Sequence, residues 1–75
     1  MVTLTTMKSG QRGTVVAIQA GWGARRRLEV LGIRPGAKLQ KVSSLFARGP
    51  VVVRVGTAEI ALGYGLAEKV LVRVE

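Results

Sequence analysis

The sequence contains no cysteine, no histidine and no aspartate, and its only carboxylate side chains are four glutamates. Disulfide bonds and thiolate chemistry are therefore excluded. Transition metals bind through imidazole, thiolate or clustered carboxylate ligands, so four scattered glutamates in a basic chain predict no metal site. The serine and threonine hydroxyls have no histidine to activate them as nucleophiles. We expect neither catalysis nor a bound cofactor.

Long apolar runs are also missing. No stretch approaches the roughly 20 residues that span a bilayer, and residues 1–10 have neither the charged leader nor the apolar centre of a secretory signal. At 75 residues the chain has room for one small domain. We expect a single domain over residues 1–75 in the cytoplasm, with peripheral attachment at the inner face of the cell membrane as an alternative.

The charge balance is strongly one-sided, because 12 Lys and Arg residues stand against 4 acidic residues and give a formal net charge of +8. Such a surface attracts an acidic protein, a nucleic acid or an anionic lipid surface. Nucleic-acid sites commonly place aromatic rings among the basic residues, where the rings stack on bases. This chain has three aromatic residues, widely spaced. A nucleic-acid-binding module is therefore the weaker alternative.

Short apolar runs separated by glycines predict strands. Five runs qualify by alternation or by β-branched content, at residues 14–18, 37–42, 51–55, 58–62 and 70–74. Gly56 and Thr57 separate the third run from the fourth, which predicts a type II′ hairpin. Imperfect alternation in the second run indicates a bulge or a bend of the barrel, and one helical turn is expected at residues 66–69.

Residues 21–36 contain the one clear helical pattern and fall between the first two strand runs. Five short strands, many glycines for sharp corners and this helix predict a mainly β chain folded as a small SH3-like barrel, with an OB-like barrel as the alternative. At about 100° per residue, Ala24, Leu28 and Leu31 share one side of the helix. We expect that side to dock on the barrel.

The end of this helix carries clear stop signals. Gly32 stands where a left-handed residue caps a helix, and Ile33 stands where the Schellman motif places an apolar contact onto Leu28. Pro35 and Gly36 then favour a turn. We expect Gly32, Pro35 and Gly36 to act structurally.

Local helix stability does not explain the arginines of this stretch. Arg25, Arg26 and Arg27 crowd the start of the helix, and Arg34 follows its end. A helix N-terminus disfavours a cation by roughly 0.3–1 kcal/mol. Two interpretations remain open, a solvated basic face and an electropositive docking surface for an acidic partner or a phosphate.

Three segments resemble the ferrous iron transport protein A (FeoA) family. They are residues 25–36, which read Arg-Arg-Arg-Leu-x-x-Leu-Gly-Ile-x-Pro-Gly, residues 7–15 and residues 60–72. The resemblance covers nearly the whole chain in the family's order and spacing, although the family often carries aspartate where this chain has Val30. It implies an SH3-like barrel of the cytosol that assists FeoB, a large membrane ferrous iron transporter with a GTP-hydrolysing domain on its cytosolic side.

The resemblance and the residues together predict a protein that works by docking on FeoB. The arginines at positions 25, 26, 27 and 34 would supply charge complementarity. Leu45 and Phe46, at the tip of a loop over residues 43–50, would add apolar contact, although folding back over the barrel is the alternative. Trp22 is expected to pack against the helix entry, with anchoring of a partner as the alternative. We expect Tyr64 to cover the core.

Overall fold

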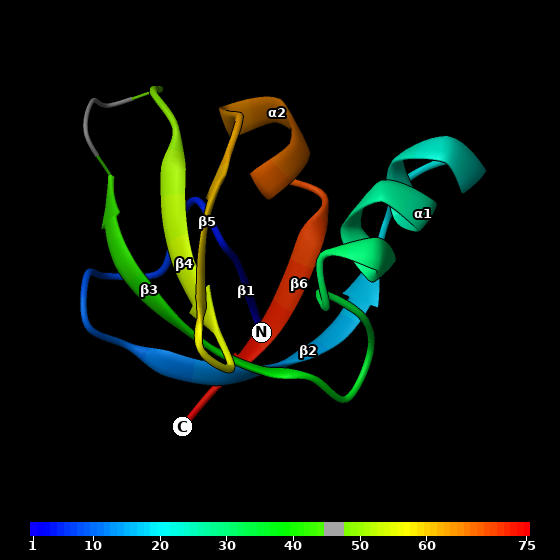
Figure 1. The fold of residues 1–75 in the computed structure, drawn as a ribbon. Coiled ribbons are helices and arrows are strands. Elements are labelled where there is room, and N and C mark those ends of the chain that lie inside the picture. The colour runs from blue at the N-terminus through cyan, green and yellow to red at the C-terminus, as the bar shows by residue number, and fades with distance from the viewer. Residues whose placement is uncertain (45–47) are drawn as a thin grey trace.

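The computed structural model describes residues 1–44 and 48–75 of the chain. In this part of the chain, strands predominate and two short helices interrupt them (Figure 1). The elements are β1 (Val2–Thr3), β2 (Arg12–Ile18), α1 (Trp22–Val30), β3 (Lys38–Ser44), β4 (Val51–Val55), β5 (Ala58–Leu62), α2 (Tyr64–Ala67) and β6 (Val70–Val74).

The strands form one antiparallel sheet in the order β1-β6-β2-β3-β4-β5. Strand β6 lies between β1 and β2, with Val72 opposite both Val2 and Val15. Strands β1 and β5 are the two edges of the sheet. Figure 1 shows the strands curling around a common interior, so the sheet has the shape of a small barrel.

The mainly β fold class is confirmed, with six strands in the described residues where the sequence indicated about five. The additional strand is β1, which Val2 and Thr3 form. Two residues are too few for an alternation pattern, and their partners Val72 and Leu71 lie at the other end of the sequence. The second helix begins at Tyr64 rather than at residue 66, directly after the extended Gly63.

Two local predictions are confirmed. Val55 pairs with Ala58 across a two-residue loop, and Gly56 has φ +61° while no non-glycine residue among those described has a positive φ. This combination is that of a type II′ turn. The register between β3 and β4 shifts between Lys41 and Ser43, which is the bulge indicated by the imperfect alternation.

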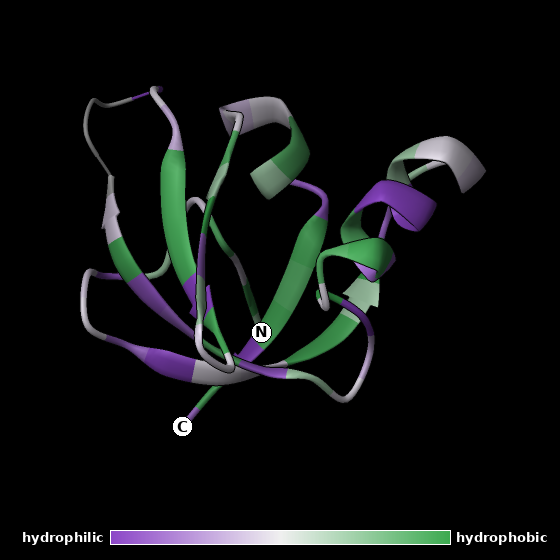
Figure 2. Cartoon of the chain, viewed as in Figure 1, coloured by the Kyte–Doolittle hydropathy of each residue, from purple (hydrophilic) through white to green (hydrophobic). Residues whose placement is uncertain are grey.

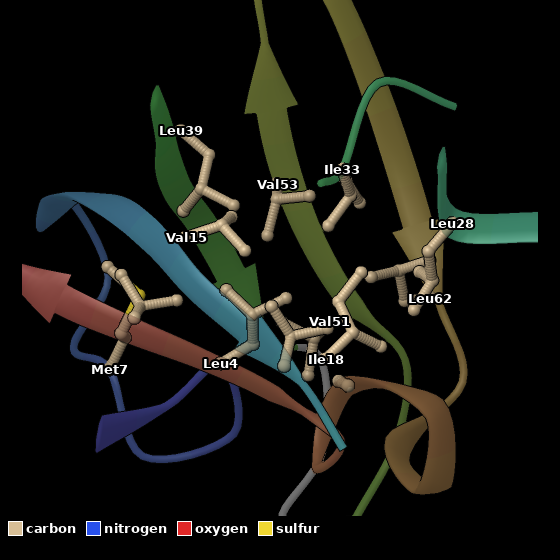
Figure 3. Close-up of a cluster of buried hydrophobic side chains, with 13 residues drawn as sticks. Leu4, Met7, Val15, Ile18, Leu28, Ile33, Leu39, Val51, Val53 and Leu62 are labelled. Atoms are coloured by element: carbon tan, nitrogen blue, oxygen red, sulfur yellow. The ribbon is translucent and has the colours of Figure 1, made fainter. Parts of the chain in front are cut away.

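The core is made of apolar side chains from every side of the barrel (Figure 3). Strands β2, β4 and β6 contribute Val15, Val53 and Val72, each at most 1% exposed. Alternate residues of β6 point outward, and Arg73 is exposed. The alternation is that of strands with one buried and one solvated face.

Lys41 is a buried cation in this barrel. Its side chain is only 2% exposed. Its Nζ donates hydrogen bonds to the carbonyl oxygens of Met7, at 2.6 Å, and Thr5, at 3.2 Å. Burial lowers the pKa of Lys41 because the charged form loses its water. The lysine ties β3 to the segment between β1 and β2.

Candidate docking surface

Helix α1 is attached to the barrel by one end. Leu28 is its only buried residue, and Figure 1 shows the rest of the helix projecting beside the barrel. Leu28 and Ile33, both 0% exposed, belong to the buried cluster that Figure 3 draws together with Leu62. The helix is therefore anchored at its C-terminal end.

A Schellman motif fixes that end. Gly32 has φ +91°. The N–H of Ile33 donates to the carbonyl of Leu28, and the N–H of Gly32 donates to the carbonyl of Glu29, both at 2.9 Å. These are the two hydrogen bonds of the motif, and the buried Ile33 supplies its apolar contact.

A type II turn follows the motif. The N–H of Ala37 donates to the carbonyl of Arg34 at 2.9 Å, with Pro35 and the left-handed Gly36 between them. The N–H of Gly36 also donates to the carbonyl of Val15 at 2.8 Å, which joins the turn to β2. Arg34 is exposed at the first position of this turn.

The outward side of α1 carries large apolar side chains, which corrects two predictions. Trp22 is 78% exposed and does not pack against the helix entry. Leu31, expected to dock with Leu28, is 43% exposed, and Val30 is 76% exposed. Trp22, Arg26 and Val30 recur every four residues and lie away from Leu28, so this spacing was the available signal.

These residues form a continuous surface, which we name the α1 outer face. Its members are Trp22, Arg25, Arg26, Arg27, Val30 and Leu31, and the exposed Glu29 is the one acidic residue among them. The guanidinium of Arg26 lies 5.8 Å from the centre of the Trp22 ring, within cation–π range. In Figure 2 the middle of α1 is hydrophilic and hydrophobic ribbon appears in its last turn, in keeping with three arginines followed by Leu28, Glu29 and Val30.

A shallow, open hollow lies on this face. It has a volume of about 320 Å³ and is lined by Arg26, Arg27, Val30 and Leu31. The lining surface is almost entirely apolar, because the arginines contribute their aliphatic stems. The hollow therefore combines an apolar lining with neighbouring cationic groups.

The positive charge of this region is not neutralised within the described residues. Arg25, Arg26, Arg27 and Arg34 are exposed, and the ion pair found in residues 1–44 and 48–75 is instead that of Arg54 with Glu59, at 2.7 Å. Helix α1 has no side-chain cap at Gly21 and no acidic residue in its first turn. The surface thus favours a negatively charged partner.

The remaining predicted residues are placed differently. Leu45 and Phe46 lie outside the described residues, so their role stays a sequence prediction. Tyr64 is half-buried at the start of α2.

Within the described ranges no three His, Cys, Asp or Glu side chains gather into a metal-binding group. None of the described helices has the length and apolar character needed to cross a membrane.

Comparisons with known proteins agree with this architecture. Residues 2–74 match the model of the FeoA domain. A putative Fe(2+) transport protein A of Methanocaldococcus jannaschii is 39% identical over 72 residues, which cover 96% of this chain and 85% of the relative.

Two solved structures extend the comparison. The crystal structure of an iron uptake regulatory protein (FeoA) is 40% identical, with a TM-score of 0.92 over 99% of this chain and 97% of that one. Stenotrophomonas maltophilia FeoA, a prokaryotic SH3 domain protein crystallised with zinc, is 27% identical, with a TM-score of 0.83 over 97% and 91% of the two chains. The barrel is thus SH3-like, and the chain belongs to the FeoA domain family.

Proposed function

We propose that this protein is an accessory of ferrous iron transport that docks on the cytosolic side of the transporter FeoB through the α1 outer face and Arg34. Family membership supports the link to ferrous iron transport. The observation that carries the docking proposal is a projecting helix whose arginines have no carboxylate partner in the described residues. Charged groups of this kind raise the rate at which two proteins associate, and they fix the orientation of the proteins in the complex.

In this proposal the nucleotide chemistry is FeoB's own. The chain has no histidine, cysteine or aspartate to offer as a catalytic group. It would instead change transport or transporter assembly by binding. Leu45 and Phe46 remain predicted contributors of apolar contact.

The test is equilibrium binding to FeoB and to its isolated cytosolic GTPase domain at about 150 mM salt, where exposed charges further apart than about 8 Å are largely screened. Replacing Arg25, Arg26 and Arg27 by glutamate lowers the net charge from +8 to +2. We expect this variant to keep its fold, because the three side chains are exposed, and to lose about tenfold or more in affinity.

A matched variant tests whether the position of the arginines, or only the net charge of the protein, determines affinity. Lys8, Arg12 and Arg73 are also exposed, and Arg12 is at the opposite end of β2 from α1. Their replacement by glutamate gives the same net charge. Full affinity of the α1 variant, or an equal loss in both variants, would contradict the proposed surface.

A parallel titration with mixed-sequence RNA tests the alternative class. Binding driven by phosphate contacts weakens steeply between about 50 and 200 mM salt, because condensed counterions are released. Tight, salt-sensitive RNA binding without any binding to FeoB would replace the docking proposal by a nucleic-acid-binding module.

A further inference from the structure

The hollow on the α1 outer face limits what kind of partner can fit there. It is lined by Val30 and Leu31 and by the side chains of Arg26 and Arg27. Its volume of about 320 Å³ is enough for one large side chain. Binding energy in protein interfaces concentrates where an apolar anchor of the partner packs on such an apolar area.

The apolar part of this face is small, which distinguishes a protein segment from a lipid surface. A helix that lies on a bilayer buries a broad apolar side between the lipids. Here Val30 and Leu31, together with the arginine stems, make the apolar lining, and Leu28 of the nine-residue helix is taken up by the barrel core. An apolar area of this size suits contact with one side chain of a folded partner better than insertion into a bilayer.

The arginines add a requirement for negative charge. Arg26 and Arg27 are exposed, and neither has a carboxylate partner within the part of the chain that the structure describes. Arginine pairs with carboxylates through two parallel hydrogen bonds, so carboxylates flanking the inserted group would complete the contact. The Trp22 ring lies against Arg26 and extends the apolar area beyond the hollow.

A second copy of this chain does not meet the requirement. Each copy carries a net charge of +8. Two α1 outer faces would bring six arginines together, with Glu29 of each helix as the nearest acidic residue in its sequence. Like charges at this density oppose association.

We infer that the α1 outer face binds an acidic amphipathic protein segment, whose large apolar side chain enters the hollow while its carboxylates pair with Arg26 and Arg27. The inference rests on the proposed function in taking FeoB as the source of that segment. It gives Trp22, Val30 and Leu31 a role in affinity of their own, and it makes apolar contact, not charge alone, the basis of affinity.

The test uses a variant that keeps every charge. Val30→Gln together with Leu31→Gln makes the lining of the hollow polar, and glutamine is a good helix former. Both side chains are solvent-exposed, so the fold is retained. Affinity for the GTPase domain and for full-length FeoB is measured for the wild type, for this variant and for Ala61→Gln, a control at an exposed apolar residue of β5.

The inference predicts an affinity loss of about tenfold or more in the double variant and none in the control. Unchanged affinity in the double variant would overturn the inference while leaving the docking proposal intact, because charge alone would then explain binding. Absence of any wild-type binding to FeoB would instead contradict the proposed function, and the inference would be decided by a second probe.

That probe is a synthetic helical peptide with one leucine flanked by glutamates, compared with the same peptide carrying serine at the leucine position. Trp22 is the only tryptophan, so its fluorescence reports on α1. Binding of the leucine peptide about tenfold more tightly than the serine peptide would support the inference. Equal binding of the two peptides, or binding only to vesicles of phosphatidylglycerol and phosphatidylethanolamine, would overturn it.

Discussion

At the scale of single residues, Gly13 has no space for a side chain. A Cβ atom at this position would lie 2.4 Å from Cγ1 of Val72 and 2.6 Å from the carbonyl oxygen of Arg73. Because the second neighbour is backbone, β2 and β6 would have to separate. We expect Gly13→Ala to lower the free energy of unfolding by about 2–3 kcal/mol, measured by urea denaturation.

The matched control is Gly23→Ala in α1. Apart from its two chain neighbours and the nearby backbone of its own helix, no atom lies within 4 Å of the Cβ that this change adds. Alanine also favours a helix over glycine by roughly 0.5–1 kcal/mol, so this variant should be as stable as the wild type or slightly more stable. Equal stability of the two variants would show that β2 and β6 are not packed as closely as described.

Lys41 provides a second prediction at this scale. Lys41→Met has a similar shape but removes the donor to the carbonyl oxygens of Met7 and Thr5. A buried carbonyl left without a donor costs about 1–3 kcal/mol. We expect the free energy of unfolding to fall by that amount near neutral pH, measured by urea denaturation.

The lowered pKa of Lys41 also predicts a pH dependence. Between that pKa and the usual value of 10.5, the unfolded chain binds more protons than the native protein. The stability contributed by this site therefore rises with pH in that window and levels off above 10.5. The stability of the wild type minus that of Lys41→Met should increase as pH approaches 10.5 from below. A stability difference that does not change with pH would contradict the lowered pKa of Lys41.

At the scale of elements, α1 depends on a single buried side chain. Leu28→Ala should lower the free energy of unfolding by about 2–4 kcal/mol, because it empties a fully buried site. Val30→Ala, at a residue 76% exposed on the same helix, should change it by less than about 0.5 kcal/mol. Thermal and urea unfolding compare the two, and a similar loss in both would mean that the outer face is covered.

The elements that the sequence predicted are those whose signals are local. The hairpin follows from Gly56 and Thr57 between two apolar runs, and its geometry needs no distant partner. Strand β1 has no such signal, because β6 creates it by pairing with Val2 and Thr3. The family resemblance gave the barrel type, which periodicity alone left open between two barrels.

The docking surface was only partly predictable for a related reason. The arginines of α1 stand out by their charge, whereas the exposure of Trp22 depends on how the helix is anchored. Leu28 and Ile33 hold the helix by its end, and the sequence pattern alone favoured a helix lying flat on the barrel. The hollow lined by Arg26, Arg27, Val30 and Leu31 is a property of side-chain positions, which a linear pattern does not contain.

At the scale of the whole molecule, the net charge of +8 should govern the rate of association. Long-range attraction speeds encounter and is screened by salt, while short-range contacts control dissociation. Raising salt from about 50 to 500 mM should slow association with FeoB about tenfold or more and change dissociation less than about twofold. Stopped-flow measurements of Trp22 fluorescence would test this. A salt effect mainly on dissociation would contradict electrostatic steering.

Strand β6 is synthesised after the other strands, yet it lies inside the sheet, between β1 and β2. While the chain is being made, β3, β4 and β5 can pair as a meander of sequence neighbours, but β1 has no partner. Pairing between strands that are far apart in the sequence, such as β1 and β6, forms late, and the edges of these strands stay unpaired until then. The nascent chain therefore carries an unpaired N-terminal arm, and its barrel closes only once residues 70–74 have left the ribosome.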